Sequence, residues 1–118
     1  MGIDVYLEWK DKQEHLFEAP YYLRESYHGE PYATPVLFKE AFAVNDGNRE
    51  SYRCRLSTEE LEERLPEALK LTAERHFKIY SHEGLESLKE SLQDIVDFVQ
   101  EFKELEEIGE EPFIEVSY

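Results

Sequence analysis

Residues 85–105 read LESLKESLQDIVDFVQEFKEL, and this stretch decides the fold. Its large apolar side chains recur at alternating intervals of three and four residues, at Leu85, Leu88, Leu92, Ile95, Val99 and Phe102. This spacing places them along one side of an α-helix, and Val96, Phe98 and Leu105 widen the apolar stripe. Gly109 then suits a left-handed cap that ends the helix. The stretch predicts a long amphipathic helix whose apolar side packs on a sheet.

A second helical pattern precedes this stretch. Ser57 and Glu60 have the spacing of a capping box, which opens a helix. Helical spacing then continues through Leu61, Leu65, Ala68, Leu69, Thr72, His76 and Tyr80. Pro66 interrupts the pattern, and a proline inside a helix costs about 3 kcal/mol. We therefore expect a short helix that ends near Leu65 and a second helix that has Pro66 in its first turn.

Strand patterns flank the helical half of the chain. Apolar and polar residues alternate from Ile3 to Trp9, which predicts a strand with one face buried. Residues 113–118 predict a last strand after the helices. Residues 14–35 show no clean period, and we interpret them as a structured excursion with a short strand near His15–Phe17 or Tyr21–Arg24.

The middle of the chain predicts a β-hairpin. One strand would carry Val36, Phe38, Phe42 and Val44 on one face, and the other strand would carry Tyr52, Cys54 and Leu56. Residues 45–48 between them read NDGN, a turn signal, because Asn, Asp and Gly tolerate positive φ. A helical turn over Phe38–Phe42 is the alternative interpretation.

These elements together predict an α+β fold. We expect a mostly antiparallel sheet of about four strands with an antiparallel helix pair packed on one face, because the apolar faces need partners. No repeat or linker interrupts the 118 residues, so we expect residues 1–118 to form a single domain.

The chain is strongly acidic. It carries 28 acidic and 13 basic residues, a net charge of −15, and residues 57–118 hold 18 of the acids and only 6 of the bases. Nucleic-acid backbones and anionic membranes need clustered Lys and Arg, so we expect neither as a partner. A solvated helix surface is the structural interpretation of this charge, and a basic protein partner is the functional one.

The number of cysteines and the first residues of the chain indicate the cellular compartment. The single cysteine, Cys54, excludes an intrachain disulfide and an all-cysteine metal site. No apolar run approaches the ~20 residues of a membrane span. Residues 1–4 lack the basic and apolar character of a secretory signal. We therefore expect a cytoplasmic protein.

Residues 21–35 concentrate chemical groups. They hold four of the eight tyrosines with an arginine and a histidine, and loops on a rigid scaffold are where sites usually lie. The candidate pocket consists of Arg24, Glu25, Tyr27, His28, Tyr32 and Thr34. His28 would act as a general acid or base with Tyr27, Tyr32 or Glu25 as helpers, and Arg24 would hold an anionic ligand.

The same residues also have structural interpretations. His28 would be a loop histidine hydrogen-bonded to the backbone beside Gly29. Arg24 would pair with Glu25, Glu30 or the acidic helices. The tyrosines would cover one end of the core with their hydroxyls in water.

Three blocks of the chain resemble a family of small, uncharacterised bacterial proteins. They are residues 1–7, the run from Tyr22 to Leu37, and Arg64–Leu69. The most specific block is 23–34, LRESYHGEPYAT. The resemblance implies no activity and transfers no catalytic residue.

Metal and nucleophile motifs are weak. Glu25 and His28 have the spacing used in di-iron bundles, but such bundles need a second pair and two further glutamates. His76, His82 and Glu83 would join them only by a coincidence of folding. Cys54 occupies a strand position where an inert thiol is expected, and the sequence has no nucleophile elbow or phosphate-binding glycine loop. We assign no catalytic residue, no metal and no cofactor.

Three functions are compatible with this sequence. We favour a non-catalytic protein-interaction module with an acidic helical face. The first alternative is a small enzyme or ligand-binding protein that uses the loop Tyr21–Thr34. The second is a homo-oligomeric housekeeping domain, with a homodimer formed through a strand edge or an aromatic patch.

Overall fold

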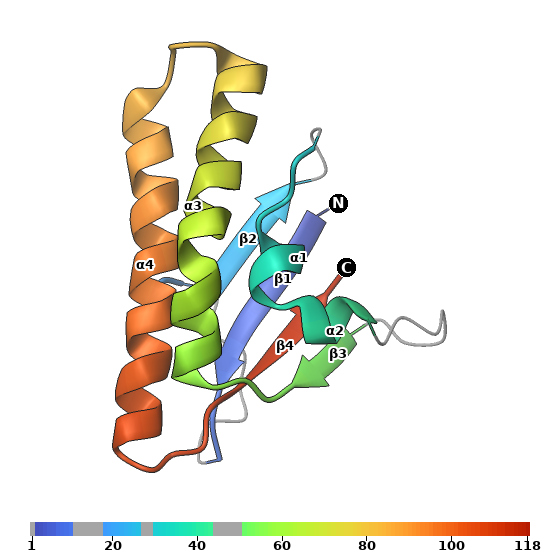
Figure 1. The fold of residues 1–118 in the computed structure, drawn as a ribbon, viewed down its shortest axis with the longest axis vertical. Helices are drawn as coiled ribbons and strands as arrows, with labels where there is room; N and C mark the ends of the chain where they lie inside the picture. Colours follow the sequence, from blue (N-terminus) through green and yellow to red (C-terminus); the bar gives the residue numbers. More distant parts are fainter. Residues whose placement is uncertain (1, 11–17, 27–29, 44–50) are drawn as a thin grey trace.

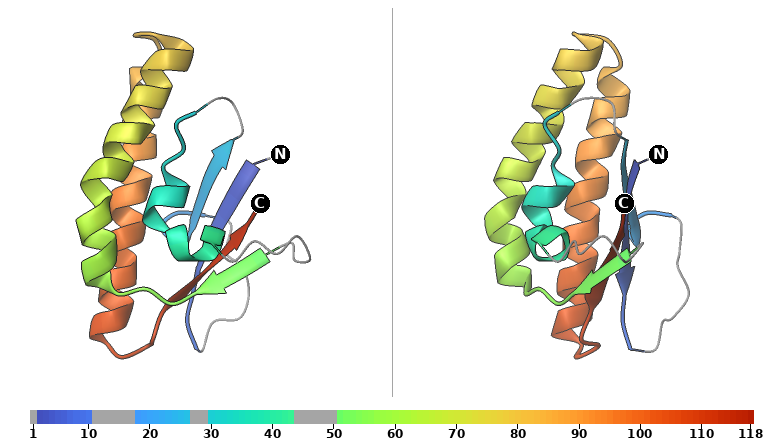
Figure 2. Two further views of the ribbon diagram at one scale, coloured as in Figure 1. Left: turned by 45° about the vertical axis from the view of Figure 1, so that its right-hand side comes forward. Right: turned by 90° about the vertical axis from the view of Figure 1, so that its right-hand side faces the viewer.

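The structure is a computed structural model that describes residues 2–10, 18–26, 30–43 and 51–118. Its strands are β1 (Gly2–Glu8), β2 (Tyr22–Ser26), β3 (Ser51–Cys54) and β4 (Phe113–Ser117). Its helices are α1 (Thr34–Leu37), α2 (Lys39–Ala43), α3 (Thr58–Tyr80) and α4 (Leu85–Glu107). The strands form one antiparallel sheet in the order β2-β1-β4-β3, and all four helices lie on one face of it (Figures 1 and 2). The predicted α+β architecture is therefore confirmed.

The register of the sheet places its apolar side chains on the face toward the helices. Val5 of β1 lies opposite Leu23 of β2 on one side and Val116 of β4 on the other. Tyr52 of β3 lies opposite Val116 in turn. Since side chains alternate along a strand, these four residues share one face, and all are buried.

The helix pair buries its apolar stripe against this face, as predicted. Leu88, Ile95 and Phe102 of α4 are buried, and the ring of Phe98 meets the ring of Phe38 edge-on with centroids 5.5 Å apart. The predicted stripe is too long, because Leu85 is exposed. The end of the helix pair near Leu85 extends beyond the strands, so no sheet covers it (Figures 1 and 2). Val96 is also exposed, because it points away from the buried side of α4.

The predicted break at Pro66 is wrong, because α3 runs from Thr58 to Tyr80 without interruption and contains the proline. Leu61 and Ala68, on either side of it, are fully buried in the same core. Pro66 itself lies on the exposed side of α3. The carbonyl that loses its partner there can bind water, while both halves of the helix keep their apolar contacts.

The predicted strand over Val36–Val44 is also wrong, because Thr34–Leu37 and Lys39–Ala43 are helical. The alternative of a helical turn over Phe38–Phe42 is closer to the structure. Pro35 sits in the first turn of α1, where a proline is tolerated. Leu37, Phe38 and Ala41 are fully buried, so helical spacing suits the core here. Val44 and the turn at 45–48 lie outside the described residues.

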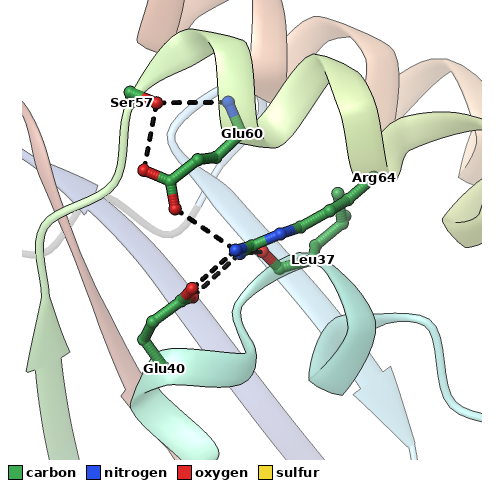
Figure 3. Close-up of polar contacts among 5 residues, drawn as sticks. All are labelled: Leu37, Glu40, Ser57, Glu60 and Arg64. Atoms are coloured by element: carbon green, nitrogen blue, oxygen red, sulfur yellow. Dashed lines mark hydrogen bonds and ion pairs between the residues drawn. The ribbon is translucent and has the colours of Figure 1, made fainter.

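A single arginine joins α1 and α2 to α3 (Figure 3). Arg64 donates to the Leu37 carbonyl at 3.0 Å and to both carboxylate oxygens of Glu40 at 2.8 and 2.5 Å. It also reaches Glu60 at 3.2 Å, and Glu60 binds the Ser57 hydroxyl that caps α3. Arg64 holds the pKa of Glu40 below its usual value, chiefly by hydrogen bonding. Ser57 therefore caps α3 as predicted, but the Glu60 side chain binds the Ser57 hydroxyl and not its backbone N–H, and the contacts continue into a longer polar chain.

The face of β1 that points away from the helices is less exposed than we expected for a strand with only one buried face. Tyr6 and Glu8 are buried there, and the ring of Tyr6 lies 5.3 Å from the ring of Tyr22. Asp4 on this face accepts hydrogen bonds from the Tyr22 hydroxyl and from Arg24, the latter at 2.6 Å. Polar pairs and aromatic contact thus cover this face of β1.

The helix ends follow their local sequence signals. Gly109 has φ of 83°, its N–H donates to Glu106, and the N–H of Glu110 donates to Leu105. This pattern is a Schellman motif, which confirms the predicted left-handed cap. Within the described ranges, no helix is both long enough and apolar enough to cross a membrane.

Candidate functional site

A cavity of about 400 Å³ lies between the edge strand β2 and the helices α1, α3 and α4. Its apolar walls include Leu23, Leu37, Ile79, Leu88 and Ile95. Its polar lining includes Glu25 and Thr34 on one side, Thr72, Arg75 and His76 on α3, and Ser87, Ser91 and Asp94 on α4. A concave site with apolar walls and a few polar groups is the usual form of a ligand pocket.

Glu25 connects β2 to the start of α1. It lies opposite Ile3 in the sheet, and Ile3 belongs to the buried face, so the Glu25 side chain points toward the helices. Its carboxylate accepts hydrogen bonds from the backbone N–H of Ala33 at 2.9 Å and of Thr34 at 3.2 Å. It also accepts from the Thr34 hydroxyl at 2.8 Å. Glu25 therefore satisfies the donors at the start of α1, which would otherwise lack partners.

Arg75 of α3 lies on the other side of Glu25. One guanidinium nitrogen lies 3.7 Å from the Glu25 carboxylate, and the side chains of the two residues are only 11% and 10% exposed. The other terminal nitrogen donates to the backbone carbonyl of Ser26. The guanidinium also stacks over the ring of Tyr32 at 5.0 Å. Arg75 thus joins α3 to the end of β2 and to the segment before α1.

The α4 side of the cavity is polar and open. Ser87, Ser91 and Asp94 are spaced four and three residues apart, so they share one side of the helix, and all three are exposed. Partial burial raises the pKa of Asp94, and the neighbouring charges of Asp97 and Glu90 raise it further. Asp94 forms no ion pair with any residue in the described part of the chain.

The free end of the helix pair adjoins this cavity and carries exposed apolar side chains. Phe77, Ile79, Tyr80 and Leu85 are 41%, 40%, 55% and 55% exposed, and we call them the hairpin-end cluster. They are four of the six large apolar side chains exposed among the described residues. Ile79 and Tyr80 also line the cavity.

Local contacts hold together the end of the helix pair where a loop joins α3 to α4. The His76 ring donates from Nε2 to the Glu83 carbonyl at 2.7 Å, and its centroid lies 5.1 Å from the ring of Tyr80. The ring of Phe77 lies 5.7 Å from the rings of His76 and of His82. These contacts hold the rings of Phe77 and Tyr80 against the histidines and the loop between α3 and α4.

The structure brings together three of the six residues in the predicted pocket. Glu25 and Thr34 are hydrogen-bonded to each other, and Tyr32 stacks on Arg75 beside them. The guanidinium of Arg24 instead binds Asp4 on the opposite face of the sheet, with a side chain that is 47% exposed. Tyr27 and His28 lie outside the described residues. The acid–base role considered for His28 therefore stays a hypothesis.

Sequence reasoning missed the helical half of this site. Arg75 falls beside an apolar stripe and far along the chain from residues 21–35, so the sequence does not associate it with them. The sequence does contain a pattern that points to this half of the site, a regularly spaced polar side on each helix. The polar residues are Thr72, Arg75 and His76 on α3 and Ser87, Ser91 and Asp94 on α4. Only folding places these two polar sides opposite β2.

Two other kinds of chemistry have little support in the described structure. Burial raises the pKa of the Cys54 thiol to about 11, so the thiol stays protonated and unreactive at neutral pH. The described ranges contain no group of three or more His, Cys, Asp or Glu side chains arranged to hold a metal ion.

Comparison of the chain with protein-family models, with curated proteins and with solved structures found no match in any of the three. The resemblance to small bacterial proteins therefore stays a prediction. Two of the blocks that carry it meet in space, since Arg64 donates to the Leu37 carbonyl.

Proposed function

We propose that the protein is a non-catalytic interaction module that binds a basic partner protein through the end of its helix pair. The observation that carries this proposal is the hairpin-end cluster, defined above as Phe77, Ile79, Tyr80 and Leu85. Four of the six exposed large apolar side chains among the described residues lie at this one end of the helix pair, and apolar surface concentrated in one region is a feature of protein-binding surfaces.

The order of the hairpin end supports this proposal. The N–H of Ser81 donates to Phe77 at 3.0 Å, and the N–H of Glu83 donates to Tyr80 at 3.0 Å. The His76 ring closes the same loop through Glu83. A surface that is already ordered loses less conformational entropy when it binds, so a modest contact area can give useful affinity.

The charge around the cluster indicates the chemistry of the partner. Glu74, Glu83, Glu86 and Glu90 are exposed on this half of the helix pair, where the exposed cations are Lys70, Lys78 and Lys89, and Lys70 pairs with Glu74. An acidic rim around an apolar centre attracts a partner that carries Lys and Arg beside apolar residues. We place this interaction in the cytoplasm, since the only cysteine of the chain is a free thiol.

The test is affinity capture from a lysate of the source cells with three forms of the full chain. They are the wild type, a double variant with Tyr80→Ser and Leu85→Ser, and the control Ile108→Ser. Ile108 is 70% exposed at the other end of α4, so the control removes a similar apolar group away from the cluster. We expect the wild type and the control to retain the same basic protein, and the double variant to lose it.

Ionic strength gives a second readout. The Debye length falls from about 8 Å at physiological ionic strength to about 3 Å at 1 M salt, so high salt should weaken the capture strongly. The proposal fails if no basic protein is retained, or if all three forms retain the same proteins. Circular dichroism should show that the double variant is as folded as the control, because both of its positions are exposed.

A further inference from the structure

The cavity next to the hairpin-end cluster contains a carboxylate that the described structure does not neutralise. Glu25 is already bound by two backbone N–H groups, by the Thr34 hydroxyl and by Arg75. None of the described cations pairs with Asp94, and Glu90 and Asp97 lie one turn before and after it on α4. Glu18, which precedes β2, adds another acidic side chain to the lining. A cation entering the cavity would relieve this repulsion.

The basic side chains in the lining do not offset these charges. The guanidinium of Arg24 is bound to Asp4 on the other face of the sheet. Arg75 is bound to Glu25 and Ser26 and stacks on Tyr32. The Nε of Arg75 has no acceptor in the described part of the chain, but it is buried and therefore out of reach of a ligand. The cavity thus favours a cation over an anion.

Apolar side chains line the cavity beside its polar groups. Leu88 and Ile95 are buried side chains of α4 on either side of it in sequence, and Ile79 of α3 lines the same cavity. Lys and Arg side chains combine an aliphatic stem with a charged head, so they suit a site with apolar walls and a carboxylate at its open side. The hydroxyls of Ser87 and Ser91 offer further acceptors on the same side of α4.

We infer that the cavity receives a lysine or arginine side chain from the basic partner segment that docks on the hairpin-end cluster. Its aliphatic stem lies along Ile79 and Leu88, and its charged head binds Asp94. This inference rests on the proposed function and identifies the part of the partner that enters the cavity. Ile79 and Tyr80 belong to both the cluster and the cavity, so one segment can occupy the two together.

The test uses small analogues of the two side chains as probes. Butylguanidinium, butylammonium and the neutral analogue butylurea are titrated into the full chain, and the backbone amide shifts are followed by NMR. We expect saturable shifts at residues 75–80 and 87–95 with the two cations and none with butylurea. Asp94→Asn should weaken butylguanidinium binding about tenfold, which corresponds to about 1.4 kcal/mol for a lost charge-assisted contact.

Asp97→Asn is the matched control. It removes the same charge one turn along α4, from a side chain that accepts a hydrogen bond from Gln93 at 2.8 Å and does not line the cavity. We expect it to change the affinity less than about twofold, a few tenths of a kcal/mol, as a screened surface charge would. Equal losses in the two variants would mean a diffuse acidic field and would overturn the inference. Binding of butylurea as tight as that of the cations would overturn it as well.

Capture of the partner separates this inference from the proposed function. If Asp94→Asn retains the basic protein as well as Asp97→Asn does, while the double variant with Tyr80→Ser and Leu85→Ser loses it, the interaction module stands and the cavity inference falls. If the cations bind through Asp94 but the wild type captures no basic protein, the cavity is a site for a free small cation. Both the proposed function and the inference are then wrong.

Discussion

Glu25 shows how one side chain can organise a site. It lies on an edge strand, and the pleat directs its carboxylate toward the helices. There it meets the first donors of α1 and the guanidinium of Arg75, in a place where both side chains are about nine-tenths buried. Buried polar groups need partners, so the positions of α1 and of β2 depend on this contact.

We predict that Glu25→Ala lowers the free energy of unfolding by about 2–4 kcal/mol. The substitution leaves two backbone donors and the Thr34 hydroxyl without their acceptor, and it leaves the buried Arg75 without the carboxylate of its ion pair. Urea denaturation measures the change. The control is Glu74→Ala, because Glu74 is an exposed glutamate of α3 whose ion pair with Lys70 spans 3.9 Å. It should cost no more than about 0.5 kcal/mol. Similar losses in the two variants would show that Glu25 does not organise the site.

At the scale of an element, α3 continues through an internal proline. Pro66 lies nine residues into the helix on the exposed side, and its neighbours Leu61 and Ala68 hold the buried side in place. Arg64 adds contacts to α1 and α2 within the same turn (Figure 3). Tertiary contacts on either side thus outweigh the local cost of the proline.

We expect Pro66→Ala to raise the free energy of unfolding by about 2 kcal/mol. Alanine restores a backbone N–H and removes the clash of the proline ring, and the greater freedom of the unfolded chain offsets part of this gain. Thermal and urea denaturation of the variant are compared with those of Glu67→Ala, an exposed neighbour. A stability below that of the wild type would indicate that α3 requires the proline.

At the scale of the whole molecule, charge and shape act together. The chain carries a net charge of −15, and many of its carboxylates lie on the exposed sides of α3 and α4. The helix pair also reaches past the sheet, which leaves its end uncovered (Figure 1). These carboxylates repel one another. Together with the uncovered end of the helix pair, they also form an acidic, partly apolar surface for a partner.

The melting temperature should rise when sodium chloride is increased from low concentration to about 0.5 M. Salt screens the repulsion among the carboxylates, and this repulsion weakens the compact state more than the unfolded chain. Differential scanning fluorimetry measures the change. A melting temperature that stays constant or falls with salt would mean that repulsion does not limit stability.

The sequence by itself determined the elements whose pattern is local. The apolar spacing in residues 85–105 predicted α4, Ser57 and Glu60 predicted the start of α3, and Gly109 predicted the end of α4. Alternation predicted β1 and β4, and the need to cover apolar faces predicted the antiparallel layer architecture. Each of these follows from which side of one element avoids water, and a single element is enough to show that side.

Only the tertiary structure decided the helical state of residues 34–43, the continuity of α3 through Pro66 and the makeup of the cavity. The local sequence of residues 34–43 is compatible with both strand and helix. Burial of Leu37, Phe38 and Ala41 favours the helix, and so do the contacts made by Glu25 and Arg64. Arg75 reaches Glu25 across fifty positions of the sequence. Such contacts join surfaces that are far apart along the chain, so they stabilise the protein only after the helices have packed on the sheet.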